Sequence, residues 1–476
     1  MVLQNLKKLK LLINKNLIFL VFLPIIGNFL LNLISNNFFK RIENFDILNF
    51  FSTILLFYIL KLIGEISSKT FNLPMVSTGI LFYFFGIFLI NNLFIFITRY
   101  FSFSNFFVFY NIIFFAYLLS KNKGSNEIIK LFFLIILNFV YNSLFFKKFN
   151  LENFVKGDVE YLWFPMAKNI YNENYYYSLT NPVIEGYNQL ISYTQAVVLK
   201  INLNLESFTY VKSTTNIYFF LTMLLFFELN ISKKNKILLG ATYTSLVINS
   251  DWLNYLFLNS LMGEGWVNYF FCVGYISIFK ILSNNSTTKF NLKVVFLLFG
   301  TLYFSKQFIS LLVVIITLSF LFYKKTRTYI FYSIIPFFLN EINLITTLKK
   351  SKRDAYINSF DYFDTINDLL TNTNLKLNNI LIITLNLLKD TPVSYLITVF
   401  ILSFFFYILK MKKYEYEDIC VFLVFLINLF LIFILYISVW RNQPEMESPV
   451  RYILNLLNLV LIYTFIYLEK LEKLFK

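Results

Sequence analysis

LFFLIILNFVYNSLFF, residues 131–146, is an apolar run that no charged residue interrupts. Its apolar residues follow one another without the polar–apolar alternation of a transmembrane β-strand, so the run indicates a membrane helix. Runs of comparable character recur along the chain, and about 20 residues make one bilayer crossing. The sequence therefore predicts an all-α polytopic membrane protein with about fourteen transmembrane helices (range 11–14) at residues 16–35, 48–64, 74–98, 103–120, 129–147, 210–229, 236–250, 264–282, 290–304, 307–323, 328–346, 393–409, 419–439 and 450–468.

The composition excludes several classes of chemistry. Hydrophobic residues make up 58% of the 476 residues, against about 45–50% in soluble proteins. The net charge of +16 comes from lysines between apolar runs, where they set membrane orientation, so no nucleic-acid partner is expected. The chain has no histidine, and its two cysteines lie inside apolar runs. Acid–base chemistry must therefore come from Asp, Glu, Lys or Tyr.

The short basic clusters predict how the chain is oriented. With the N-terminus in the cytoplasm, the clusters at 121–123, 233–236, 324–327, 410–413 and 470–476 also lie inside. The clusters at 40–41 and 147–148 are exceptions. This orientation places the polar segments together on the outer face, at residues 157–196, 251–265, 305–307, 349–392 and 440–451. Acids at the outer ends of spans, rather than within them, favour an enzyme that works at one membrane surface.

The first of these segments is GDVEYLWFPMAKNIYNENYYYSLTNPVIEGYNQLISYTQA, residues 157–196. Asp158 and Glu160 can deprotonate and orient an acceptor hydroxyl, or together bind a divalent cation such as Mg²⁺ or Mn²⁺. The alternative is two ordinary surface acids. Trp163, Met166 and Ile170 have near-helical spacing, which predicts a short helix at the membrane interface.

Five further residues are candidates because of their charge and their place beside the apolar runs. Lys306 lies between two apolar runs and can neutralise a lipid phosphate, or it can simply mark a helix end. Arg451 precedes the last span, near Arg441 and Glu447, and an arginine can bind phosphate oxygens through two hydrogen bonds. Glu264 lies in a Gly-Glu-Gly break at the head of a span.

Taken in order, these motifs resemble the GT-C class of membrane glycosyltransferases, in particular bacterial proteins similar to dolichyl-phosphate-mannose protein mannosyltransferases. The resemblance rests on five short matches: Asp158-Val159-Glu160, Ala167-Lys168, Asn181-Pro182 with Tyr187 to Leu190, Gly300 with Ser305-Lys306-Gln307, and Ser448 with Arg451-Tyr452. It covers about residues 130–325 and 440–468. The chain departs from the family pattern because its acids are not adjacent and about four spans precede the part that resembles the family.

The resemblance implies transfer of a hexose or pentose from a polyprenyl-phosphate-linked donor to a glycan, lipid or protein acceptor. The reaction would take place on the outer, periplasmic face of a bacterial inner membrane. Asp158 and Glu160 would be catalytic. The donor phosphate and lipid would contact Lys306, Arg451, Lys168 and Arg441. The substrates would contact Tyr161, Trp163, Tyr187, Glu264 and Glu447.

We expect four parts along the chain: N-terminal helices (1–128), a catalytic core (129–347) that includes the outer loop 148–209, an outer polar loop (348–392) and C-terminal helices (393–476). Two other functions remain open. A flippase for lipid-linked oligosaccharides would place charges within spans, and Lys61, Lys280 and Glu341 are the few candidates. A glycan polymerase or ligase would carry several arginines in the loop 348–392, which has Arg353 alone.

Overall fold

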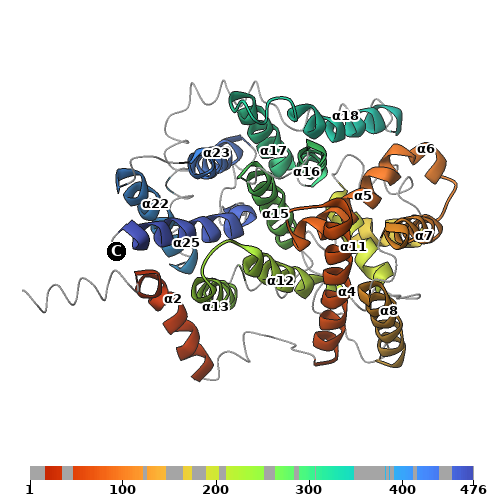
Figure 1. The fold of residues 1–476 in the computed structure, drawn as a ribbon, viewed down its shortest axis with the longest axis horizontal. Coiled ribbons are helices and arrows are strands. Elements are labelled where there is room, and N and C mark those ends of the chain that lie inside the picture. The colour runs from red at the N-terminus through yellow and green to blue at the C-terminus, as the bar shows by residue number, and fades with distance from the viewer. Residues whose placement is uncertain are drawn as a thin grey trace, which may run out of the picture. The chain divides into compact units, whose positions relative to one another are not determined.

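The computed structural model describes residues 17–34, 47–121, 126–145, 164–173, 189–202, 211–250, 253, 263–283, 289–305, 307–347, 381, 385, 391–410, 415–438 and 453–474. These residues form helices joined by turns, and no strand occurs among them (Figure 1). The predicted all-α fold is confirmed for this part of the chain.

Eight of the described helices are long and apolar enough to cross a membrane. They are α4 (Ile47–Phe71), α5 (Val76–Leu93), α7 (Phe103–Lys121), α8 (Asn126–Phe145), α15 (Glu264–Ser283), α22 (Thr391–Lys410), α23 (Tyr416–Ser438) and α25 (Leu457–Leu474) with the preceding turn η7 (Leu454–Leu456). Large apolar side chains point outward from α7 and α8, where Phe109 is 62% exposed and Phe133 is 64% exposed. Such faces require a lipid environment, so the chain is a polytopic membrane protein.

The other predicted spans are also helical but are not among these eight. They correspond to α2 (Leu17–Ile34), α12 (Val211–Glu228), α13 (Lys233–Asn249), α16 (Lys289–Thr301), α17 (Gln307–Ser319) and α18 (Ile330–Thr347). In most of them the apolar stretch within the described residues is 10–17 residues long, which is too little to establish a crossing of about 20 residues. Fourteen crossings therefore stay a prediction, while eight are supported.

The chain divides into two compact units that do not follow chain order. Unit 1 combines Met1–Asn44, Phe226–Leu258 and Asp361–Lys476, and unit 2 combines Phe45–Leu225 with Asn259–Phe360. Unit 2 thus draws on both the predicted N-terminal helices and the predicted catalytic core.

One end of unit 2 collects basic residues. Lys69 at the end of α4 pairs with Glu127 at the start of α8, with Nζ and Oε1 2.6 Å apart. Asn291 in α16 donates to the Asn72 carbonyl at 2.7 Å, which brings the start of α16 to the same end. We call this the basic end of unit 2, defined by Lys69, Lys121, Lys293, Lys324, Lys325 and Arg327.

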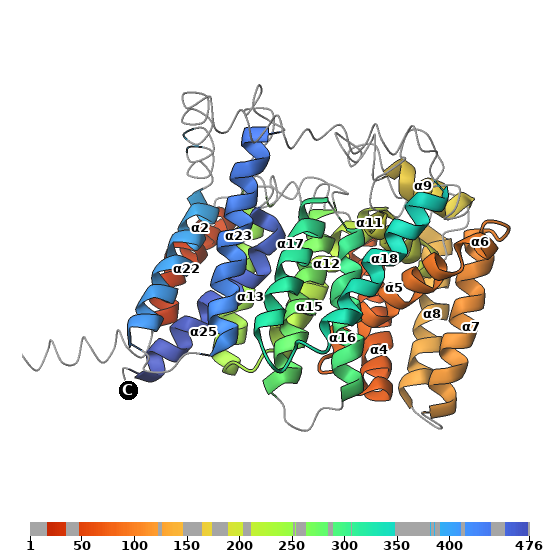
Figure 2. The same cartoon turned by 90° about the horizontal axis from the view of Figure 1, so that it is seen from above.

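The opposite end of unit 2 holds two short helices, α9 (Phe164–Asn172) and α11 (Leu190–Ile201) (Figure 2). The Phe103 amide at the start of α7 donates to the carbonyl of Glu173, just after α9, at 3.0 Å. Asn142, late in α8, donates to the carbonyl of Asn202, just after α11, at 3.0 Å. We call this the α9 end.

Unit 1 is organised around α25, and 89% of an 18-residue stretch of this helix is buried. Glu469 accepts a hydrogen bond from the Asn235 side chain in α13 at 2.7 Å. Glu472 accepts one from the Ile18 amide in α2 at 3.1 Å. Phe465 stacks on Phe22 of α2, with ring centroids 4.5 Å apart. Helix α25 therefore fixes both neighbours within unit 1.

Candidate functional site

The short helix α9 has one buried face and one exposed face. Met166 and Ile170 are 0% exposed, Ala167 is 2% exposed and Tyr171 is 7% exposed, whereas Lys168 is exposed. The buried face packs on α11 and α7, and the Ser192 hydroxyl of α11 lies 3.7 Å from the Met166 sulfur. The helix predicted from the spacing of Met166 and Ile170 is confirmed, and its apolar face is covered by protein. Its place at the membrane interface stays a prediction.

Helix α11 lies within unit 2 and is too short to cross a membrane. Its 12 residues make a helix about 18 Å long, against a hydrocarbon core of about 30 Å. Every residue of α11 is buried except Lys200, in the last turn, which is partly exposed. The one charge on this helix thus lies beneath α9 at the edge of the packed interior.

The Lys200 ammonium contacts two neighbouring helices. Its Nζ atom lies 2.6 Å from the Ser104 hydroxyl oxygen of α7 and 3.6 Å from the centre of the Tyr171 ring of α9. Burial lowers the pKa of Lys200 to about 8 and raises the pKa of Tyr171 to about 12, because a low-dielectric surrounding disfavours the charged form of each. Lys200 was not among the predicted site residues, although it is the one charged residue of this twelve-residue segment.

Glu264 is the first residue of α15 and lies between two glycines, Gly263 and Gly265, that allow close packing. A Cβ atom at Gly263 would lie 2.8 Å from a methyl carbon of Ile191 in α11, and one at Gly265 would overlap the Tyr218 ring of α12. The Gly-Glu-Gly sequence thus lets the backbone approach both helices, and Glu264 is only 1% exposed. Ile191 and Lys200 are nine residues apart in α11, or about 14 Å along the helix.

No family model, curated protein or solved structure matches this chain. Any function assigned to it therefore rests on its own residues.

Two of the predicted site residues are among those described, Lys168 and Glu264, and both lie at the α9 end of unit 2. Ser305 also lies at this end, since Phe304 beside it packs on Phe88 of α5 with ring centroids 5.0 Å apart. The other predicted site residues lie outside the described part of the chain: Asp158, Glu160, Tyr161, Trp163, Tyr187, Lys306, Arg441, Glu447 and Arg451.

The proposed cation ligands, Asp158 and Glu160, are among those residues. Within the described ranges, no group of three or more Cys, Asp or Glu side chains could hold a metal ion. A divalent cation thus stays a prediction tied to the two acids alone.

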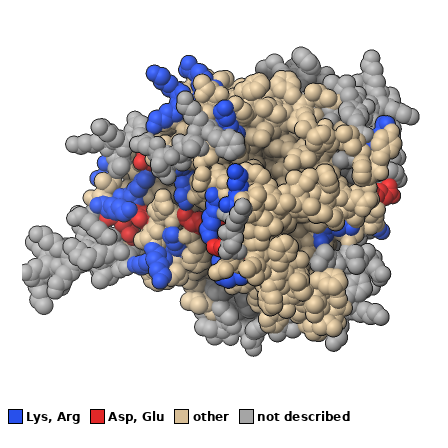
Figure 3. Space-filling view, turned by 45° about the vertical axis from the view of Figure 1, so that its right-hand side comes forward, with Lys and Arg blue, Asp and Glu red and all other residues tan. Residues whose placement is uncertain are grey.

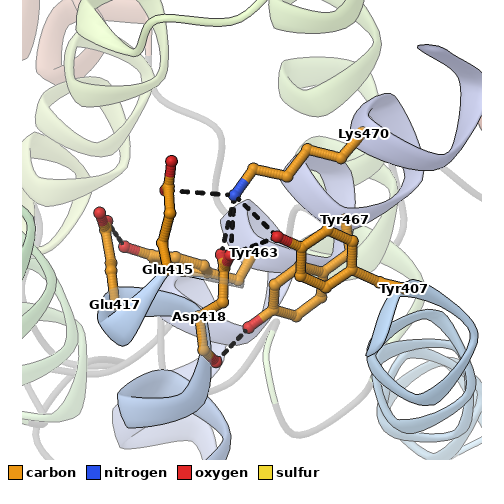
Figure 4. Close-up of polar contacts among 7 residues, drawn as sticks. All are labelled: Tyr407, Glu415, Glu417, Asp418, Tyr463, Tyr467 and Lys470. Carbon is orange, nitrogen blue, oxygen red and sulfur yellow. Dashed lines mark hydrogen bonds and ion pairs between the residues drawn. The ribbon is translucent and has the colours of Figure 1, made fainter. Parts of the chain in front are cut away.

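A second polar cluster lies in unit 1 and was not predicted (Figure 4). Lys470 of α25 contacts Asp418 of α23, with Nζ 2.8 Å from Oδ2 and 3.0 Å from Oδ1. The Tyr407 hydroxyl of α22 donates to Asp418 at 2.6 Å, and the Tyr467 hydroxyl donates to the Asp418 carbonyl at 2.9 Å. Tyr463 donates to Glu417 nearby.

The groups of this cluster bond mainly to one another. Asp418 is 1% exposed and pairs with Lys470, which also lies 3.4 Å from Glu415. The cluster joins α22, α23 and α25 inside unit 1, which is a structural role. Lysines and arginines are otherwise gathered in patches on a largely uncharged surface (Figure 3).

Proposed function

We propose that this chain is a membrane-embedded glycosyltransferase of the GT-C type. It moves a sugar from a polyprenyl-phosphate-linked donor to a glycan, lipid or protein acceptor at the α9 end of unit 2. The observation that carries the proposal is the position of α9. This amphipathic helix directly follows the segment with Asp158 and Glu160, and it is fixed at the end of unit 2 opposite the basic end.

The orientation of unit 2 supports an outward-facing site. Short loops rich in lysine and arginine stay on the cytoplasmic side, and the basic end carries Lys121, Lys324, Lys325 and Arg327. The α9 end then faces the outside, which is the periplasm if the membrane is a bacterial inner membrane. A lipid-linked donor fits this place because its tail stays in the bilayer while its phosphate and sugar lie at the surface.

The chemistry proposed is a single displacement with inversion. Asp158 or Glu160 accepts the proton of the acceptor hydroxyl, and the acceptor oxygen forms a bond to the anomeric carbon of the sugar. The bond between that carbon and the phosphate oxygen breaks, and polyprenyl phosphate leaves with both bonding electrons. Cations at the donor phosphate stabilise the charge that develops on the leaving group. Lys306 and Lys168 of unit 2 are the proposed cations. Arg441 and Arg451 belong to unit 1 and stay predictions from the sequence.

The remaining proposed residues position the substrates. Tyr161, Trp163 and Tyr187 would pack on the sugar and the first isoprene units, and Glu264 would accept hydrogen bonds from sugar hydroxyls. Glu264 lies at the α9 end and is 1% exposed, while Glu447 belongs to unit 1 and stays a prediction from the sequence.

The test is sugar transfer in membranes that contain Asp158→Asn or Glu160→Gln, with a panel of radiolabelled polyprenyl-phosphate hexoses and pentoses. Loss of the general base is expected to lower the transfer rate by about 10²-fold or more. Glu173→Gln is the matched control, because Glu173 is an exposed acid directly after α9 with no proposed role, and it should transfer at the normal rate. Normal rates in both test variants would refute the proposed site.

A further inference from the structure

Lys200 differs from other lysines that reach the protein interior or its edge. Lys61 and Lys470, whose side chains are 35% and 26% exposed, each lie within 4.0 Å of a carboxylate, namely Glu65 and Asp418. No described carboxylate lies that close to Lys200, whose contacts are the Ser104 hydroxyl and the Tyr171 ring. A cation that is partly removed from water without a counter-charge is costly to keep.

These contacts leave hydrogen-bond donors that can bind an anion. An ammonium has three N–H donors and no acceptor, and one of them is directed at Ser104. The Ser104 oxygen accepts this bond, so the hydroxyl proton remains available for a second acceptor. The Tyr171 ring face stabilises the cation electrostatically without neutralising it. Lys200 and Ser104 therefore present several donors and a full positive charge beneath α9.

We propose that Lys200 and Ser104, with the Tyr171 ring packed against the ammonium, bind the phosphate of the polyprenyl-linked donor. This inference rests on the proposed transferase function and adds a phosphate ligand to those expected from the sequence. A phosphate oxygen bound to Lys200 Nζ and the Ser104 hydroxyl would lie at the end of α11, while Glu264 lies near its start.

The charged groups around Lys200 predict how binding depends on pH. Tyr171 is the titratable group that faces the ammonium from α9, while Lys168 and Glu173 on that segment are exposed. Helix α7 contributes the uncharged Ser104, α5 has no charged residue, and the charged residues of α8, Glu127 and Lys130, lie near its start, which Glu127 places at the basic end. Since burial lowers the pKa of Lys200 to about 8, the ammonium is lost from the empty site above that pH. Donor affinity should fall as the pH rises from 7 to 9.5.

The same property separates a binding role from a structural one. The unfolded chain keeps Lys200 protonated up to about its ordinary pKa of 10.5. The folded protein binds fewer protons between pH 8 and 10.5, so its stability rises with pH in that window. Replacing the lysine with the uncharged Met, which keeps the aliphatic stem, should therefore leave the empty protein at least as stable at pH 7. A structural lysine would give the opposite result.

The experiment measures binding of radiolabelled polyprenyl phosphate, and of polyprenol as the uncharged probe, to the full-length protein in phosphatidylcholine nanodiscs at pH 7. We expect Lys200→Met to weaken polyprenyl phosphate binding by about tenfold or more, the size expected for a charge-assisted hydrogen bond, and to leave polyprenol binding unchanged. Lys200→Arg, which keeps the charge, should stay within about threefold of the wild type. The affinity of Lys200→Arg for polyprenyl phosphate should also stay constant between pH 7 and 9.5.

Competition arms distinguish the possible sources of phosphate. Equal displacement of the probe by phosphatidylglycerol or by inorganic phosphate would mean a general anion site and would overturn the donor assignment. If the wild type prefers polyprenyl phosphate to polyprenol but Lys200→Met binds polyprenyl phosphate as tightly as the wild type does, the role of Lys200 is overturned. The transferase proposal would stay intact in that case. A wild-type protein that binds polyprenol as tightly as polyprenyl phosphate would instead contradict the transferase proposal itself.

Discussion

At the scale of single residues, Gly265 has no side chain because the Tyr218 ring occupies the space where a Cβ atom would be. Gly265→Ala must displace a buried ring, and we expect it to lower the free energy of unfolding by about 1–3 kcal/mol. Gly27→Ala is the control, since nothing lies within 4 Å of a Cβ at that helical glycine, and it should stabilise α2 slightly. Thermal unfolding in detergent measures both, and equal effects would contradict the packing described here.

The charge pair of Lys470 and Asp418 gives a second prediction at this scale. Lys470→Met leaves a carboxylate that is 1% exposed without its cation, at a cost of about 3 kcal/mol of stability. The double variant with Asp418→Asn should recover part of this loss because the buried Asp418 charge is removed as well. Lys473→Met is the matched control. Its pair with Glu469 involves a lysine that is 69% exposed, so its loss should cost less than about 1 kcal/mol.

At the scale of the helix, sugar transfer should require α9 to be packed against α11 and α7. Ile170 is 0% exposed, and Ile170→Asp places a charge in the contact with α11 and α7. Releasing a nine-residue helix should lower sugar transfer by at least about tenfold, since small misplacements of positioning elements have effects of this order, while most of unit 2 stays folded. Asn172→Asp introduces the same charge on the exposed side of α9 and should leave transfer unchanged. Equal transfer rates in the two variants would show that docking of α9 is not required.

The helices also show what local sequence can predict. Helix α9 was predictable because Met166 and Ile170 are one turn apart, so the signal lies within nine residues. The importance of Lys200 was not, because it depends on Ser104, which is 96 residues away in the chain. Likewise Asp418, an acid in the first turn of α23, is paired with Lys470, which is 52 residues away in the chain. Element positions follow from periodicity, whereas the pairing of charges depends on which helices become neighbours.

At the scale of the whole molecule, membrane orientation is the property to measure. The native cysteines Cys272 and Cys420 are buried, so introduced cysteines can be labelled against a low background. A membrane-impermeant maleimide should label Lys168→Cys in intact cells and Arg327→Cys only after permeabilisation. This follows from the basic loops staying in the cytoplasm. The reverse pattern would place the α9 end inside and exclude a periplasmic donor site.

The division into two units could not be predicted from sequence. The apolar runs are similar in composition throughout, and nothing in the segments around residues 45, 226, 259 or 361 marks a change of unit. The predicted parts followed chain order, whereas unit 1 is assembled from three separated segments. Membership of a unit is decided by specific contacts, such as Glu469 with Asn235, which have no local signature.

The central place of α25 in unit 1 has a consequence for biosynthesis. Helix α2 packs on α25 through Phe22 and Ile18, yet α25 is translated more than four hundred residues later. Helix α13, which also packs on α2, follows α2 by about two hundred residues. At about 5–20 residues per second, α2 therefore waits roughly 10 seconds or longer for α13 and roughly 20 seconds or longer for α25. A ribosome that stalls before residue 457 would leave α2 and α13 without α25, and quality-control proteases would have to remove this incomplete unit.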